Sequence, residues 1–236
     1  MKNLVLLHGH GVDAAIWSEL KTHLNQYQVL MPDFSTETRY ESIEAYAVGL
    51  YEWLKTQNIE KCTLLGHSMG GYITLAFAEK YPEMLHGFGL FHSTAYADDD
   101  QKREQRQKTL RFMETHGTAA FIRQAGPNMY AEDFLEEQPQ VIKNHIKKYT
   151  LLPPNAVITG FKAIMNRTDR THVLQNATVP VLFIWGKEDK FIPFEKNIGL
   201  SELPNNAQTL VLAKSGHMGM IEDVEACSAA IRDFIN

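Results

Sequence analysis

Residues 61–72 read Lys-Cys-Thr-Leu-Leu-Gly-His-Ser-Met-Gly-Gly-Tyr, and this stretch decides the fold. The apolar residues before Gly66 are typical of a short buried strand, and those after Gly70 have the apolar density of a core helix. Ser68 lies between them in a G-x-S-x-G pattern. A serine nucleophile is presented by this pattern where a strand turns sharply into a helix, and the two glycines let strand and helix pass closely. A chance match of five residues is the alternative.

A serine hydroxyl is a weak nucleophile without a base and a group that orients the base. Asp189 follows an apolar segment in a Gly-x-x-Asp turn, and His217 follows another in a Ser-Gly-His-Met loop. Because the carboxyl ends of parallel strands share one edge of a sheet, we expect Ser68, Asp189 and His217 to meet there. Their chain order fits this architecture. Taken singly, Asp189 reads as a turn aspartate and His217 as a histidine of a surface loop.

Backbone N–H groups are the expected donors to the oxyanion, because they are rigid. Met69 follows the serine at a helix N-terminus and supplies one donor. The second is expected from His10, in the glycine-rich loop after the first apolar segment. The side chain of His10 either lines the pocket or is a bystander. His92 follows another predicted strand at the same edge and is a candidate for substrate contact.

Six apolar segments have the length of strands in a parallel sheet. They are residues 4–7, 27–31, 61–65, 85–91, 181–185 and 207–212. No strand is predicted between residues 93 and 176, where the pattern is helical and polar. We therefore expect an α/β core over 1–92 and 179–236, closed by a helix over 221–235, with a helical cap over 93–178. Such an insertion usually covers the ligand-binding edge of the sheet, although it could be a surface subdomain. The charged run 98–106 reads as a solvated helix start.

The chain has 236 residues, a net charge of −5, 44% hydrophobic and 22% charged residues, which is ordinary for one globular domain. This charge argues against a nucleic-acid or acidic-membrane partner. Cys62 and Cys227 do not form a disulfide framework, and the first apolar run is too short for a signal peptide or membrane span. We expect a cytoplasmic protein. No histidine, cysteine or carboxylate spacing indicates a metal, and oligomeric state is left open.

Together these motifs resemble the α/β-hydrolase fold superfamily, specifically its small serine carboxylesterase-like members with a helical cap. The resemblance rests on His8-Gly9-His10-Gly11 with Trp17, on Gly66–Gly71, on Gly186–Asp189 and on Gly216-His217. It implies a Ser68–Asp189–His217 triad, oxyanion N–H groups from His10 and Met69, and no cofactor. The chain begins at the strand before the oxyanion loop. A roughly six-stranded, mostly parallel sheet is therefore expected, without the first two of the usual eight strands.

A serine rather than an aspartate at the nucleophile position favours an acyl intermediate over an alkyl-ester intermediate. We therefore expect a serine hydrolase that cleaves small-molecule carboxylic esters. One alternative is a carbon–carbon bond hydrolase or a lyase with the same triad. Such sites often hold polyanionic substrates with cationic groups. No arginine lies in the core loops around Ser68, Asp189 or His217, so only arginines of the insertion could serve. A less favoured alternative is a non-enzymatic ligand-binding protein on this fold.

Overall fold

Six parallel strands form one sheet in the computed structural model, which describes all 236 residues. The strands are β1 (Asn3–Leu7), β2 (Gln28–Leu30), β3 (Cys62–His67), β4 (Leu85–Phe91), β5 (Val181–Gly186) and β6 (Ala207–Leu212). Their order in the sheet is β2-β1-β3-β4-β5-β6, and every neighbouring pair is parallel. The prediction of a six-stranded parallel sheet is confirmed.

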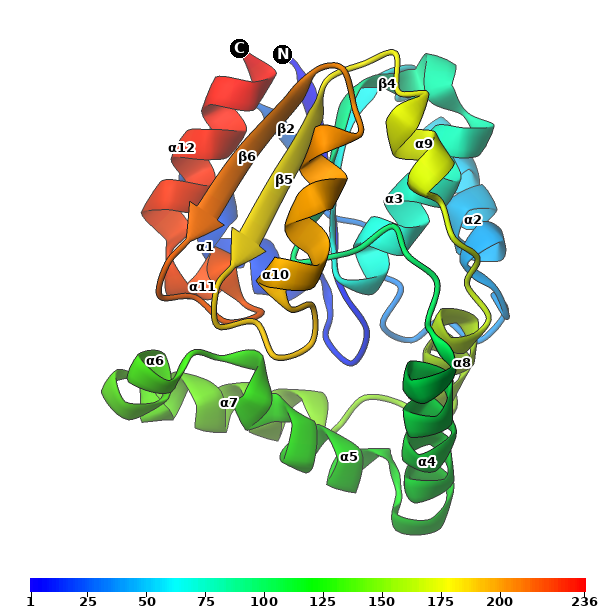
Figure 1. The fold of residues 1–236 in the computed structure, drawn as a ribbon, viewed down its shortest axis with the longest axis vertical. Coiled ribbons are helices and arrows are strands. Elements are labelled where there is room, and N and C mark those ends of the chain that lie inside the picture. The colour runs from blue at the N-terminus through cyan, green and yellow to red at the C-terminus, as the bar shows by residue number, and fades with distance from the viewer.

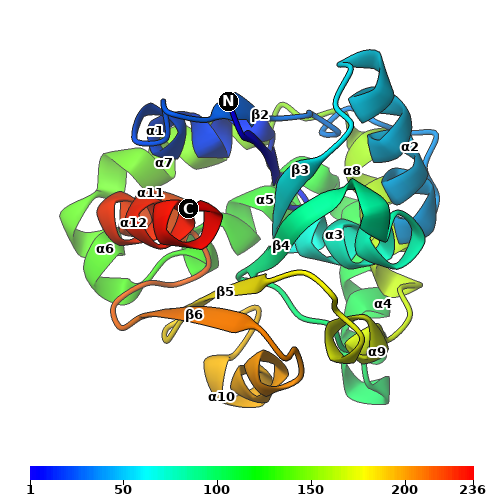
Figure 2. The same ribbon diagram turned by 90° about the horizontal axis from the view of Figure 1, so that it is seen from above.

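Helices cover both faces of this sheet (Figure 2). They are η1 (Ala14–Trp17), α1 (Ser18–Thr22), α2 (Ile43–Thr56), α3 (Met69–Lys80), η2 (Pro82–Met84), α9 (Thr171–Gln175), α10 (Phe194–Asn197), η4 (Ile198–Glu202), α11 (Gly219–Glu222) and α12 (Val224–Ile235). Successive side chains of β1 point to opposite faces, so Val5 packs with α2 and α3 while Leu6 packs with α1 and α12. No helix has both the length and the apolar character needed to cross a lipid bilayer.

The insertion between β4 and β5 is helical, as its pattern predicts. Besides α9, which packs on α3 of the core, it contains α4 (Asp100–His116), α5 (Thr118–Ala125), η3 (Gly126–Met129), α6 (Glu132–Glu137), α7 (Pro139–Tyr149) and α8 (Pro154–Met165). In Figure 1 these helices lie beyond the arrowheads of β5 and β6, which mark the carboxyl ends of the strands. The insertion therefore faces the sheet edge at which Ser68, Asp189 and His217 emerge.

The end of the chain differs from the expected single helix over 221–235. Two helices, α11 and α12, are separated at Asp223, whose φ of −147° is extended rather than helical. The Asp223 carboxylate accepts a hydrogen bond from the N–H of Ala226 at 3.1 Å. Aspartate is a favoured N-cap, so the apolar pattern continues while the backbone restarts a helix.

Candidate active site

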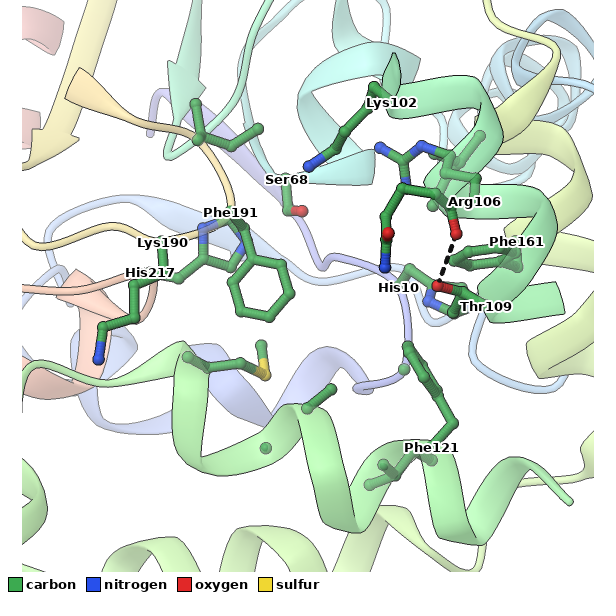
Figure 3. Close-up of a pocket in the computed structure, with 18 of the residues that line it drawn as sticks. His10, Ser68, Lys102, Arg106, Thr109, Phe121, Phe161, Lys190, Phe191 and His217 are labelled. Carbon is green, nitrogen blue, oxygen red and sulfur yellow. Dashed lines mark hydrogen bonds between the residues drawn. The ribbon is translucent and has the colours of Figure 1, made fainter. Parts of the chain in front are cut away.

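Ser68 occupies the single residue between β3 and α3. Its φ of 52° and ψ of −117° lie in a region that non-glycine residues seldom adopt. The bend is held by its neighbours: the Ser68 N–H donates to the carbonyl of Phe91 at 3.0 Å, and the Ser93 hydroxyl donates to the carbonyl of Ser68 at 2.7 Å. This backbone directs the Ser68 side chain into a cavity between core and cap (Figure 3).

The glycines around Ser68 are required by close backbone approach. A Cβ on Gly66 would lie 2.1 Å from the carbonyl oxygen of Gly70, and a Cβ on Gly70 would lie 2.6 Å from that of Leu7. Both distances are far below van der Waals contact. The expectation that strand and helix cross too closely for side chains at these two positions is confirmed.

Asp189 and His217 emerge from the loops after β5 and β6 and contact each other. His217 Nδ1 lies 2.7 Å from Asp189 Oδ2, and Asp189 Oδ1 accepts hydrogen bonds from the N–H groups of Phe191 and Ile192. Burial would raise the pKa of Asp189, but the charge and hydrogen bond of His217 outweigh it and hold that pKa below its usual range. The Nδ1 proton faces the carboxylate, which leaves Nε2 as the ring atom that can accept a proton.

Ser68 and His217 line the same cavity, and in Figure 3 they lie on neighbouring parts of its wall. The Ser68 hydroxyl makes no hydrogen bond, so the contact between nucleophile and base is not closed in this conformation. In free enzymes such contacts are often long and tighten when substrate binds. The structure thus brings all three predicted residues to one edge of the sheet and forms one of their two hydrogen bonds.

The two predicted oxyanion donors are unpaired. The backbone N–H groups of His10 and Met69 donate to no acceptor within the protein, and that of Met69 opens helix α3. The His10 ring lines the cavity and shares a 2.7 Å hydrogen bond with the carbonyl of Val157 in α8. Burial lowers the pKa of His10 to about 4, so the ring is neutral near pH 7 and donates its Nε2 proton to this carbonyl. The side chain therefore joins the oxyanion loop to the cap.

His92 lies behind Asp189 and outside the cavity wall. Its side chain is fully buried, so it is not available for the substrate contact expected from the sequence. Nε2 of His92 accepts the N–H of Gly219 at 3.2 Å, and the protonated Nδ1 faces Asp189 Oδ2 at 3.3 Å. Burial lowers the pKa of His92, which is consistent with a neutral ring. His92 and His217 thus both approach the same oxygen of Asp189, with their ring centres 5.9 Å apart.

A further set of contacts fixes the His217 loop, and the sequence did not point to it. The carboxylate of Glu222 accepts the N–H groups of Gly216 and Met218 at 2.9 Å each. Nε2 of the buried His67 lies 2.8 Å from the carbonyl oxygen of His217 and donates to it. The only sequence signal was proximity, since Glu222 lies one short helix after His217. These contacts fix the backbone of the loop on both sides of the imidazole, and the His67 ring also packs against it at 4.7 Å between ring centres.

His92, Asp189 and His217 place one potential ligand atom each within 4.8 Å of one another, a spread that a metal site would also have. Their chemistry does not suit a metal. The 2.7 Å contact from His217 Nδ1 is a hydrogen bond, and Nδ1 of His92 carries the proton that its Nε2 lacks. Two protonated nitrogens facing one carboxylate fit a proton-transfer site better.

The cavity beside Ser68 has a volume of about 310 Å³. Aromatic side chains form much of its wall, among them Phe121 and Phe161 from the cap and Phe191 from the loop after β5 (Figure 3). Lys102 and Arg106 of α4 also line it. The volume lies at the lower end of the range for small-molecule sites. A small, partly apolar ligand fits such a space.

The prediction of a solvated face for residues 98–106 is wrong in part. Asp98 is buried and pairs with both Arg106 and Arg167, while Lys102 and Arg106 turn inward to the cavity. The i, i+4 spacing of Lys102 and Arg106 places these two residues on one face of α4, while Asp98 lies just before the helix. Charge alone did not distinguish this inward face from a solvated one.

Comparisons with known proteins agree with this geometry. A family model described as alpha/beta hydrolase fold matches residues 2–224. The pimeloyl-[acyl-carrier protein] methyl ester esterase of Yersinia enterocolitica is 25% identical over 240 residues, covering 98% of this chain and 92% of that protein. The 2-hydroxy-6-oxononadienedioate/2-hydroxy-6-oxononatrienedioate hydrolase of Paraburkholderia phymatum is 26% identical over 269 residues, covering 99% and 87%. A thermophilic esterase from Thermogutta terrifontis, solved with malate bound, superposes with a TM-score of 0.92 at 25% identity, covering 100% and 89%.

Proposed function

The chain is a hydrolase that belongs to the α/β-hydrolase fold family, and from this premise we propose that it cleaves carboxylic esters through an acyl-enzyme on Ser68. One observation carries the proposal: Ser68 and His217 line the same cavity and His217 is hydrogen-bonded to Asp189, although more than a hundred residues separate Ser68 from either. Esterases among its relatives support it. The substrate is a small-molecule ester, in keeping with a cavity of about 310 Å³.

In the proposed reaction His217 Nε2 takes the proton of Ser68 as the serine oxygen attacks the ester carbonyl. The negative charge that develops on the carbonyl oxygen is stabilised by the N–H groups of His10 and Met69, which have no other partner. His217 then gives its proton to the alcohol as the carbon–oxygen bond breaks. Water, deprotonated by His217, releases the acid in the second half. Asp189 holds the imidazole in the required tautomer and stabilises the imidazolium.

Covalent labelling tests the proposal. A fluorophosphonate is expected to modify Ser68 stoichiometrically, as mapped by mass spectrometry of the labelled peptide, and to leave the Ser68→Ala variant unmodified. Labelling is expected to abolish hydrolysis of short-chain esters. Intact protein that is not labelled at Ser68, or that retains ester hydrolysis after complete labelling, would contradict the proposal. A non-enzymatic binding protein would not react.

A carbon–carbon bond hydrolase with the same triad is the second candidate. The lack of arginine in the core loops argued against it, but Arg106 and Lys102 of the insertion do line the cavity, which removes much of that objection. One relative is named as a hydrolase of 2-hydroxy-6-oxo dienedioates. Parallel assays with short-chain esters and with a vinylogous 1,5-diketone distinguish the two, since we expect turnover of the esters only.

A cytoplasmic location is proposed together with this activity. Cys62 and Cys227 are both free and buried. Proteins of oxidising compartments tend to use cysteine in disulfides, whereas buried free thiols are ordinary in a reducing compartment.

A further inference from the structure

The wall of the active-site cavity carries an unusual charge distribution. Its 20 lining residues include the cations Lys102, Arg106 and Lys190, and no aspartate or glutamate. Lys190 is paired with Glu132 at 3.4 Å near the surface. Arg106 is paired with Asp98, and its guanidinium lies 5.7 Å from the ring centre of Phe161. Lys102 is the cation that remains to be explained.

The ammonium group of Lys102 has no partner in the protein. It takes part in no ion pair and no hydrogen bond, and the nearby carboxylate of Asp98 is already shared by Arg106 and Arg167. In Figure 3 the side chain leaves α4 and extends toward Ser68 along the cavity. A half-buried ammonium without a counter-ion is rare, because burial disfavours the charge.

Three features make this lysine costly in the free protein. It is partly buried, it lies in the first turn of α4 where the helix dipole favours negative charge, and Arg106 is one turn further on the same face. Burial and then the Arg106 charge lower the pKa of Lys102. A bound anion would relieve all three.

We propose that Lys102 binds a carboxylate on the acyl part of the substrate, so that the enzyme hydrolyses half-esters of short dicarboxylic acids. This inference rests on the proposed esterase activity. The acyl assignment follows from the positions of the catalytic groups. His217 gives its proton to the leaving alcohol, so the alcohol lies on the His217 side of Ser68. Lys102 approaches Ser68 from the other side (Figure 3).

The chemical class follows from the cavity. Its volume of about 310 Å³ leaves room for a short chain, and Tyr72, Ile164 and Ile192 are among the residues that line it. A methylene chain would lie along these side chains while its terminal carboxylate meets the ammonium. Arg106 also attracts the substrate carboxylate at longer range while it keeps its ion pair with Asp98.

Monomethyl glutarate and methyl pentanoate test the inference, since their acyl chains have nearly the same shape and differ in the terminal carboxylate. We expect the enzyme to prefer monomethyl glutarate in kcat/KM, measured by methanol release. Lys102→Met should lower kcat/KM for monomethyl glutarate roughly tenfold to a hundredfold, the usual range for a hydrogen bond to a charged group. The same substitution should leave kcat/KM for methyl pentanoate nearly unchanged. Lys143→Met, which removes an exposed lysine of α7, is the matched control.

Equal losses on both esters, or no change on either, would overturn the inference. A loss confined to an ester with the carboxylate in its alcohol part, such as acetoxyacetate, would overturn the acyl assignment. A measurement without turnover separates this question from the esterase proposal. Calorimetric binding of monomethyl glutarate to Ser68→Ala is expected to weaken tenfold or more in Ser68→Ala/Lys102→Met, and equal or absent binding would contradict the role of Lys102 even if Ser68 proves not to be a nucleophile.

Discussion

Ser68 and His92 both have a strained backbone conformation at the sheet edge that carries the proposed active site. Both have positive φ, 52° and 47°, and they directly follow the neighbouring strands β3 and β4. Such conformations cost on the order of 1–3 kcal/mol each and persist only where the surroundings impose them. Here the N–H of Ser68 is held by Phe91 and that of His92 by Ile184. The strain is therefore concentrated at the sheet edge that carries the active site.

Buried neutral histidines predict an acid-sensitive fold. His145 of α7 is buried against Tyr130, whose hydroxyl lies 2.9 Å from its Nδ1, and burial lowers the pKa of His145 to about 4. Between that pH and the ordinary value near 6.5, the unfolded chain binds a proton that the folded chain does not. The free energy of unfolding therefore falls as pH drops through this window, by about 1.4 kcal/mol per pH unit for a fully protonated unfolded group.

Urea unfolding at pH 7 and pH 5 measures this effect. His145→Gln removes the titrating group while keeping a polar partner for Tyr130, so the loss of stability between the two pH values should be smaller in the variant. His116→Gln, at an exposed position of α4, should follow the unmodified protein. An identical pH dependence in all three proteins would show that His145 is not buried in its neutral form.

At the level of elements, the packing of β3 against α3 is the feature on which the site depends most. A methyl group on Gly66 would meet the backbone of Gly70 at 2.1 Å and the Thr74 hydroxyl at 2.4 Å, and neither can move without displacing the helix. Gly66→Ala should destabilise the fold by several kcal/mol, roughly 3 or more, as severe overpacking does. Gly199→Ala is the matched control, because a Cβ there has nothing within 4 Å.

Thermal unfolding of the two variants gives the comparison. Gly66→Ala is expected to unfold at a much lower temperature or not to accumulate, and Gly199→Ala to stay within about 1 kcal/mol of the unmodified protein. Equal stabilities would mean that β3 and α3 are further apart than the structure places them.

The inner strands β1, β3 and β5 were predictable from the sequence because a strand buried on both faces is apolar along most of its length. The strands predicted over residues 85–91 and 207–212 have the same bounds as β4 and β6. The bend at Ser68 was predictable because few patterns satisfy its geometry. The break at Asp223 was not, because the apolar periodicity runs through it and only the capping hydrogen bond to Ala226 marks a new helix.

At the scale of the whole molecule, the cap and the core are joined by polar contacts that meet around the site. The backbone carbonyl of Met129 in the cap accepts a hydrogen bond from the N–H of His217 at 2.7 Å. The Glu222 carboxylate accepts hydrogen bonds from the N–H groups of Ala131 in the cap and Gly216 in the core. The backbone around His217, the proposed general base, is thus held by both cap and core. Movement of the cap and the position of His217 are expected to be coupled.

These contacts could not be predicted from the sequence, because they join segments with no local pattern in common. The direction of the Lys102 side chain toward the cavity could not be predicted either, because it depends on how α4 packs on α8 rather than on the sequence of α4 alone. The meeting of Ser68, Asp189 and His217 could be predicted because each follows a strand, and parallel strands bring their carboxyl ends to one edge. The cavity walls depend on the packing of the cap and required the structure.

The most direct test asks whether Ser68 and His217 act as one unit. Activities of Ser68→Ala, His217→Ala and the double variant are measured on one short-chain ester, with folding checked by circular dichroism. Each single substitution should lower kcat by roughly 10⁴-fold or more, and the double variant should be no slower than the slower single, because removing either group disables the same step. Losses that multiply in the double variant, or near-normal turnover by folded Ser68→Ala, would contradict catalysis by a Ser68–His217–Asp189 triad.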